Sequence, residues 1–150
     1  PVDCAEGAMI DEWSGDIGCG VKYFSQDSVI KLAPRAGISL DETLSPAEKL
    51  KVVQKLMEEG DPRAAKVYAT IGVYLAHSLV YYYDLYACKH VLLLGRVMSG
   101  KGGDLILDMC KRVLDDEYPE LSDKIFPSLP DEKFRRVGQS MAAASLPESK

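Results

Sequence analysis

The residues of this chain whose types and spacing could do chemistry lie between Val91 and Asp104. The stretch opens with a short apolar run typical of a buried parallel strand, continues through four glycines, an arginine and a lysine, and leads into apolar residues at helical spacing. A strand, a glycine-rich turn and a helix in this order often bind phosphate, because glycine exposes backbone N–H groups and a helix N-terminus carries partial positive charge. The ordinary alternative is a strand-to-helix connection whose glycines serve only the turn.

Taken as a motif, Gly95-x4-Gly100-Lys101-Gly102 comes close to the P-loop signature, which binds the phosphates of a nucleotide. It departs from that signature at Gly102, where a serine or threonine hydroxyl would bind magnesium. No acidic strand end follows that would hold the metal, and the sequence predicts a single further strand after this one. A true P-loop is therefore the weaker interpretation.

The composition is that of an ordinary globular protein and argues against several functional classes. The 150 residues suffice for a single domain with a hydrophobic core, and 47% of them are apolar and 27% charged. A net charge of −5 with no basic stripe argues against a nucleic-acid binder, and no apolar run approaches the roughly 20 residues that span a membrane. Because the chain starts at Pro1 without an initiating methionine, we expect a processed chain or a piece of a longer one.

The cysteines and histidines do not form a metal-binding pattern. Four cysteines are scattered without a CxxC pair, at Cys4, Cys19, Cys88 and Cys110. This spacing favours reduced thiols over disulfides or a zinc site, and we expect a cytoplasmic protein. His77 and His90 have no second ligand at metal spacing, so both are predicted to be structural.

The opening of the chain is glycine-rich and irregular. Ala8–Ile10 and Val21–Phe24 are predicted to be short strands, and the single tryptophan, Trp13, is predicted to be a packing anchor. Ser25 fits the cap of a short helix that stops at Pro34, because the residue before a proline disfavours helix.

Two strong helix signals follow. Ser45, Pro46 and Glu48 form a capping box with proline at the first helical position, and Gly60 ends that helix. The next helix is predicted to run from Asp61-Pro62 to about Tyr86. Its mid-helix glycine, Gly72, costs about 1 kcal/mol relative to alanine, which a close contact with a neighbouring helix or sheet would justify.

The remaining elements indicate an α/β domain weighted toward helix. Of the three consecutive tyrosines 81–83, at least one is predicted to be buried and one exposed. Lys124–Phe126 is predicted to be a second core strand, and Pro130-Asp131 to open a last helix that runs to Ala144. Two or three core strands are few for a complete doubly wound fold, so we expect half of a larger structure.

Three places in the chain resemble one known family. Gly18-Cys19-x-x-x-Tyr23-x-Ser25 is similar to a Gly-Cys-Leu-Glu-x-Tyr-x-Ser stretch, and the helix around Gly72–Ala76 leads into Val91–Gly95 as that family's helix leads into a Val-Leu-Gly-Gly turn. Residues 125–144 resemble its closing strand, glycine and small-residue helix. The family is the ROK family (repressors, open reading frames and sugar kinases), within the actin–hexokinase–Hsp70 ATPase superfamily.

The resemblance implies the C-terminal lobe of an actin-like ATPase, with a helix-rich, ribonuclease H-like α/β fold built from a small sheet and packed helices. In such proteins two lobes close over ATP and a sugar, and the phosphoryl group passes to a sugar hydroxyl. The implied cofactors are ATP and Mg²⁺, bound mainly through the N-terminal lobe. The implied partners are a nucleotide, a sugar, and either the missing N-terminal lobe or further copies of the chain.

The resemblance also assigns roles to particular residues. The turn after the strand would lie beside the nucleotide, which implies contacts from Gly95, Arg96, Ser99, Gly100 and Lys101. Glu6 would be a remnant of the segment that binds the sugar. No catalytic residue and no metal ligand are assigned to this chain.

Several departures from the family pattern support an alternative. Arg96 replaces the second glycine of the turn, Val21 stands where the sugar-binding glutamate would fall, and only Cys19 remains of a zinc cluster. The histidine that ends the family's sugar-binding segment is missing after Glu6. Nothing in the chain matches the strand with the catalytic aspartate, which belongs to the N-terminal lobe. The alternative is a catalytically eroded regulatory or assembly module, so whether this chain is part of an active enzyme stays open.

Overall fold

A computed structural model describes residues 8–130 of the chain. The elements follow in the order α1 (Val21–Phe24), α2 (Gln26–Arg35), α3 (Pro46–Glu58), α4 (Pro62–Tyr86), β1 (His90–Leu92), the 3-10 helix η1 (Arg96–Met98), α5 (Gly100–Glu117), α6 (Pro119–Ser122) and β2 (Phe126–Ser128). β1 and β2 form a parallel pair. The described part is therefore an α/β structure in which helices predominate, as the sequence predicts.

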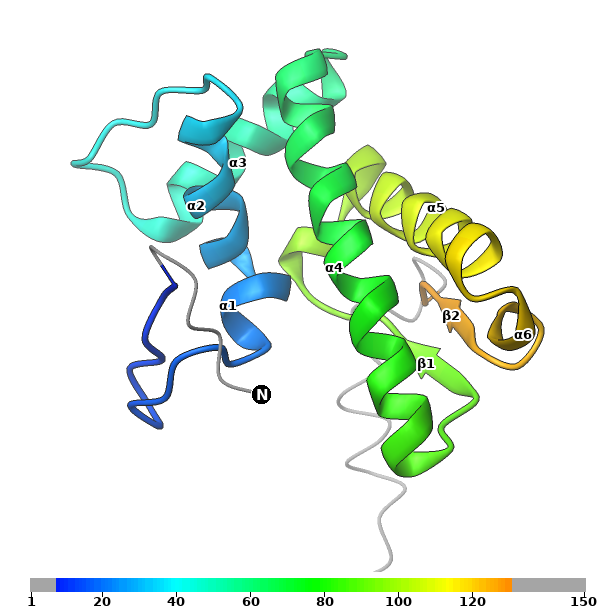
Figure 1. Ribbon diagram of the computed structural model, residues 1–150. Helices are drawn as coiled ribbons and strands as arrows, with labels where there is room; N and C mark the ends of the chain where they lie inside the picture. The colour runs from blue at the N-terminus through cyan, green and yellow to red at the C-terminus, as the bar shows by residue number, and fades with distance from the viewer. Residues whose placement is uncertain (1–7, 131–150) are drawn as a thin grey trace, which may run out of the picture.

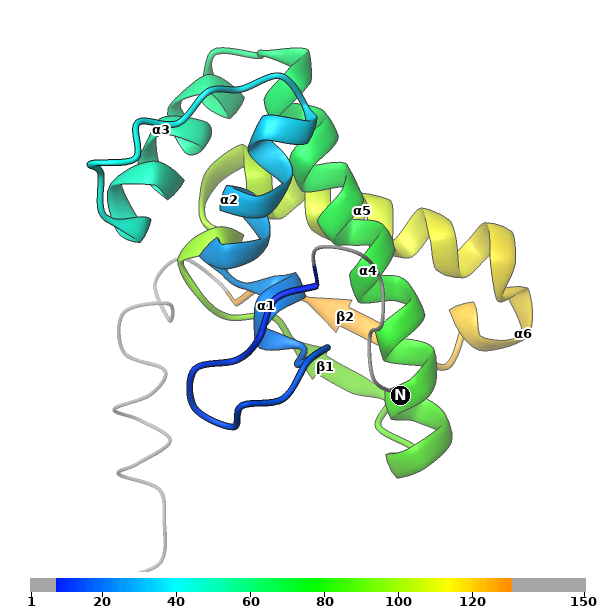
Figure 2. The same ribbon diagram turned by 60° about the vertical axis from the view of Figure 1, so that its left-hand side comes forward.

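The long helix α4 is the centre of the arrangement (Figure 1). Helices α1 and α2 pack along one side of it, and α5 packs along another, in the most extensive contact between any two elements of residues 8–130. The two strands lie next to each other (Figure 2), and β2 contacts α5. Because α5 connects β1 to β2, the sheet and the two long helices form one packed unit.

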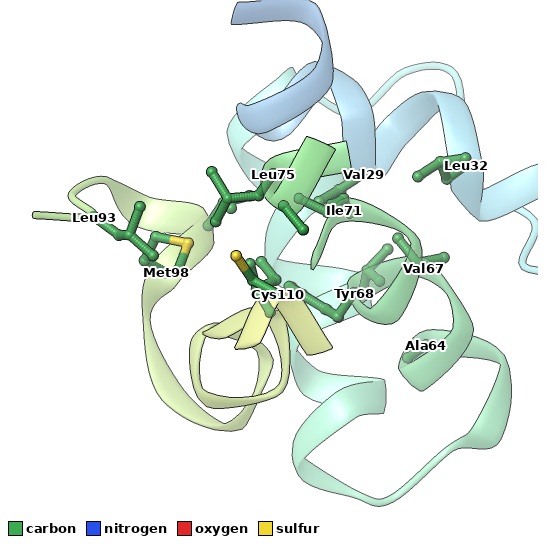
Figure 3. Close-up of a cluster of buried hydrophobic side chains, with 14 of the residues drawn as sticks. Val29, Leu32, Ala64, Val67, Tyr68, Ile71, Leu75, Leu93, Met98 and Cys110 are labelled. Carbon is green, nitrogen blue, oxygen red and sulfur yellow. The ribbon is translucent and has the colours of Figure 1, made fainter. Parts of the chain in front are cut away.

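The core lies where α2, α3, α4 and α5 meet, and its side chains come from all four helices (Figure 3). Its largest fully buried side chain is Tyr68 of α4, followed by aliphatic residues of the neighbouring helices. The fully buried set is Tyr68, Leu50, Ile71, Leu79, Ile106, Leu114, Val29, Val53, Val67, Cys110 and Ser28. Burial raises the pKa of the Cys110 thiol to about 12, because it disfavours the thiolate.

The predicted helix signals at the start of α3 and α4 are confirmed. The Ser45 side chain accepts from the Glu48 N–H, and the Glu48 carboxylate accepts from the Ser45 N–H, which completes the capping box. Gly60 has φ +83° just after α3, a conformation that favours glycine. Asp61 then caps α4 by accepting from the Arg63 N–H.

Gly72 marks the close approach of α4 to α5 that its position predicts. A Cβ atom at this position would lie 2.7 Å from the backbone oxygen of Ile106 and 2.8 Å from the Cβ of Met109. Both of those residues belong to α5. The missing side chain therefore lets the two helix backbones pack closely, which offsets the low helix propensity of glycine.

The opening of the chain differs from its prediction. Val21–Phe24 is a single helical turn and not a strand, with the Phe24 N–H donating to the carbonyl of Gly20. Of Ala8–Ile10, only Ile10 pairs, in an isolated bridge to Ile17. Trp13 is 99% exposed, so its prediction as a packing anchor is wrong.

Lys22 explains why this first turn folds back on the body of the protein. Its ammonium donates to Glu12 at 2.5 Å and to Asp27 at 2.8 Å, although its side chain is almost fully buried. The two carboxylates raise the pKa of Lys22 above its ordinary value, and Lys22 in turn lowers the pKa of Glu12. A charged hub that the sequence pattern does not reveal thus joins the opening loop to α1 and α2.

Two further boundaries differ from the sequence prediction. Helix α2 continues through Pro34 and ends at Arg35, and Ser25 caps its start as predicted. The second strand occupies Phe126–Ser128, two residues later than predicted. The predicted last helix beyond Pro130, like Glu6 and Cys4, lies outside the described residues.

The aromatic residues near the C-terminal end of α4 follow their predictions. Tyr81 and Tyr82 are exposed, and Tyr83 packs against the core. His77 shares a 2.8 Å hydrogen bond with the Tyr118 hydroxyl, and the His90 ring stacks on Phe126. Both histidines therefore have structural contacts.

Substitution of Gly72 by alanine tests the helix contact. We expect Gly72→Ala to lower the free energy of unfolding by about 1–3 kcal/mol, because the overlap with α5 outweighs the higher helix propensity of alanine. Urea denaturation measures the change, with Lys66→Ala on the exposed face of the same helix as a control that changes stability by less than about 0.5 kcal/mol. An unchanged or raised stability in Gly72→Ala would contradict the close approach.

Candidate functional site

The candidate site is the connection between β1 and α5. After β1, the chain turns at Gly95, forms η1 over Arg96–Met98 and enters α5 at Gly100. Three of the four glycines of the stretch thus belong to the first turn of a helix, where the sequence predicts loop. The glycine-rich loop is therefore shorter than predicted, and only Gly95 lies outside a helix.

Two of the helical glycines make room for neighbouring groups. A Cβ atom on Gly102 would lie 2.5 Å from the Tyr68 ring of α4, and one on Gly103 would overlap the backbone carbonyl of Met98. Both glycines are buried. Their conformational freedom is not the reason for their presence; close packing of α5 on α4 and on η1 is.

The turn itself is open to solvent. Gly95 has φ +120° and ψ 168°, a conformation that is almost restricted to glycine, and a Cβ atom there would meet nothing within 4 Å. Leu94 before it is 57% exposed. Within residues 8–130, no hydrogen bond or ion pair engages the guanidinium of Arg96. The turn therefore presents backbone N–H groups that have no hydrogen bond within residues 8–130, an apolar side chain and an uncommitted cation. The carbonyls of Gly95 and Arg96 are engaged by other groups.

The N-terminus of α5 is already occupied by a carboxylate of the chain. Glu58, the last residue of α3, accepts the N–H of Lys101 at 2.9 Å. The Lys101 ammonium donates to the backbone carbonyl of Glu58 at 2.8 Å and lies 3.8 Å from its carboxylate. A carboxylate satisfies the orphan amides and the partial positive charge of a helix start, so a phosphate would have to displace Glu58 to bind here.

The predicted nucleotide contacts divide into two groups. Gly95 and Arg96 lie on the open turn, whereas Gly100 and Lys101 lie against Glu58. Ser99 is exposed at the start of α5, and its side chain makes no capping hydrogen bond there.

Two residues of α3 that contact this region were not predicted from the sequence. Gln54 donates its side-chain amide to the backbone carbonyl of Arg96 at 2.9 Å, and Glu58 contacts Lys101 as described above. Each contact joins residues more than 40 positions apart in the chain, so no local pattern signals it.

Other features of residues 8–130 do not add a metal or membrane site. No group of three or more histidine, cysteine, aspartate or glutamate side chains in this part of the chain could hold a metal ion. None of its helices has the length and apolar character needed to cross a membrane.

A pocket of about 370 Å³ lies between the end of α5 and the start of β2, lined by residues that include Lys111, Asp115 and Phe126.

Comparisons with protein-family models, with curated proteins and with solved structures find no match to this chain.

Alanine at two glycines separates packing from turn formation. We expect Gly103→Ala to lower the free energy of unfolding by about 3 kcal/mol, because its Cβ overlaps a backbone carbonyl that cannot move without η1. Gly95→Ala should cost about 1–2 kcal/mol, because only backbone strain opposes it. Urea denaturation of both variants gives the order, and a larger loss in Gly95→Ala would contradict this division of roles.

Proposed function

We propose that this chain is the C-terminal, nucleotide-positioning lobe of a ROK-like, ATP-dependent sugar kinase with an actin-like fold. The observation that carries the proposal is the open turn at Leu94–Arg96, where Gly95 leaves its backbone accessible and Arg96 has an uncommitted guanidinium. The order of elements supports it, since a long helix leads through the strand β1 into this turn, as in the family that the sequence resembles. β1 itself is largely exposed, unlike the buried strand that its apolar sequence predicts.

The chemistry of the turn suits a nucleotide. An exposed leucine offers an apolar contact, free backbone groups offer hydrogen bonds, and a guanidinium offers a charge-assisted bond to a phosphate oxygen. The start of α5 is less suited, because Glu58 holds it. Nucleotide contact in this proposal is therefore confined to the turn and does not use the α5 amides. These groups are of the kinds that bind the phosphates of ATP, and no step is assigned to Mg²⁺.

Exposed apolar residues support a further lobe or further copies of the chain. They gather on the C-terminal end of α4 and on the strands, at Tyr81, Leu85, Tyr86, Leu92 and Phe126. Single exposed apolar side chains are normal on protein surfaces, and in this proposal the set belongs to the surface that a further lobe or copy covers.

A second candidate, the eroded regulatory or assembly module, is favoured by one specific observation. Val21, at the position of the family's sugar-binding glutamate, is half exposed and carries no polar group, and the neighbouring Lys22 is fully engaged by Glu12 and Asp27. A partner segment with an Asp-x-Gly-x-Thr strand that restores sugar phosphorylation would decide for the kinase.

Titration of the 150-residue chain with ADP, followed by the NMR shifts of its backbone amides, tests the proposal. We expect millimolar binding with the largest shifts at residues 94–96. Gly95→Val should weaken ADP binding more than Lys101→Ala does, because a branched side chain blocks the turn. Lys101→Ala should change the affinity by less than about threefold, since its ammonium is exposed and already used by Glu58.

Circular dichroism first establishes that each variant is folded. Loss of ADP binding in Lys101→Ala together with a mild effect of Gly95→Val would favour a P-loop over the proposed turn. If ADP produced no shifts in the unaltered chain, the proposed nucleotide role would be wrong.

A further inference from the structure

We propose that Gln54 and Glu58 of α3 are positioning residues that hold the nucleotide-facing turn in its binding geometry. The inference rests on the proposed function, because it concerns the same turn. It goes further in assigning a role to two side chains from a distant part of the sequence.

Gln54 holds the turn at its centre. Its side-chain amide donates to the carbonyl oxygen of Arg96 at 2.9 Å, and the same oxygen accepts from the Ser99 N–H at 3.3 Å. The carbonyl that closes η1 is thus also tied to α3. Because this oxygen belongs to Arg96, the bond fixes the backbone from which the Arg96 side chain extends.

Glu58 holds the other end of the same segment. Its carboxylate accepts the Lys101 N–H at 2.9 Å, while its backbone carbonyl accepts from the Lys101 ammonium at 2.8 Å. The fit against Gly100 is close, since a Cβ atom there would lie 2.5 Å from the carboxylate oxygen of Glu58. The six residues from Arg96 to Lys101 are therefore tied to α3 at both ends.

Helix α3 is rigid enough to serve as a support. Its start is fixed by the capping box, and Leu50 and Val53 anchor it in the core. Gln54 directly follows Val53, and Glu58 lies four residues later, so both side chains leave the same face of the helix.

These contacts are suited to positioning more than to global stability. Glu58 and Lys101 are about half exposed, and bonds between exposed groups contribute little to the free energy of unfolding. They do restrict the turn by tying its backbone to α3. A turn held in its bound conformation binds more tightly, because less conformational entropy is lost on binding.

The ADP affinity of side-chain variants, measured by amide shifts of the 150-residue chain, tests this role. Gln54→Glu keeps the shape but loses the donor, and Glu58→Ala loses the acceptor; each should weaken ADP binding by about 3- to 10-fold. Glu58→Gln retains an acceptor oxygen for the Lys101 N–H and should bind within about twofold of the unaltered chain. Unfolding temperatures should stay within a few degrees throughout.

Amide hydrogen exchange gives a second readout that does not need a nucleotide. The Met98 and Ser99 N–H groups donate within η1, to Gly95 and Arg96, and should exchange faster in Gln54→Glu. Lys55→Ala, which removes an exposed side chain from another face of α3, serves as the matched control and should change neither exchange nor affinity.

The outcomes separate the two proposals. If the unaltered chain binds ADP but Gln54→Glu and Glu58→Ala bind it equally well, the positioning role is wrong and the proposed function stands. An equal loss of ADP affinity in Lys55→Ala would also overturn the positioning role, since any substitution on α3 would then weaken ADP binding. If the unaltered chain does not bind ADP, the proposed function fails, and the role in nucleotide positioning falls with it.

Discussion

The structure depends on the close approach of α5 to α4. Gly72 of α4 admits the backbone of α5 at Ile106, and one helical turn away Gly102 of α5 admits the ring of Tyr68. Each helix thus supplies a glycine where the other supplies bulk. A methyl group at either position would separate the two helices, and dense interiors tolerate such overlaps poorly.

This contact also decides where the open turn lies. Because α5 must begin at Gly100 to bring Gly102 against Tyr68, and Gly103 must lie on Met98, the chain between β1 and α5 is short and follows a fixed path. Among the four glycines between Val91 and Asp104, Gly95 alone has no neighbouring atom within 4 Å of an added Cβ. The glycines that suggest a phosphate-binding loop therefore serve mainly helix packing. Gln54 and Glu58 of α3 form hydrogen bonds to this segment, and its exposed turn lies at Gly95.

Much of the fold could be predicted from signals that lie close together in the sequence. The sequence predicts the capping box at Ser45 and the Asp61-Pro62 start of α4, because each depends on a few neighbouring residues. It also predicts the close contact at Gly72, because a glycine inside a helix is unfavourable without one. The bonds from Lys22 to Glu12 and from Gln54 to Arg96 join residues that are separated in the sequence. No local pattern of residues therefore predicts them.

The errors have the same origin. Val21–Phe24 is predicted as a strand by composition, but it forms a helical turn whose Lys22 pairs with Glu12 and Asp27. Trp13 reads as an anchor by size, but size alone does not place a side chain inside. The glycines at 102 and 103 suit a ligand loop as well as a helix contact, and only the position of Tyr68 and Met98 tells the two apart.

A double-mutant cycle between Gly102 and Tyr68 tests this account most directly. Gly102→Ala should lower the free energy of unfolding by about 2 kcal/mol in the unaltered chain, because its methyl group overlaps the ring. In a Tyr68→Val background the ring atoms are gone, so at least about 1 kcal/mol of that loss should disappear. Strictly additive losses, measured by urea denaturation, would show that Gly102 does not serve the contact between α4 and α5.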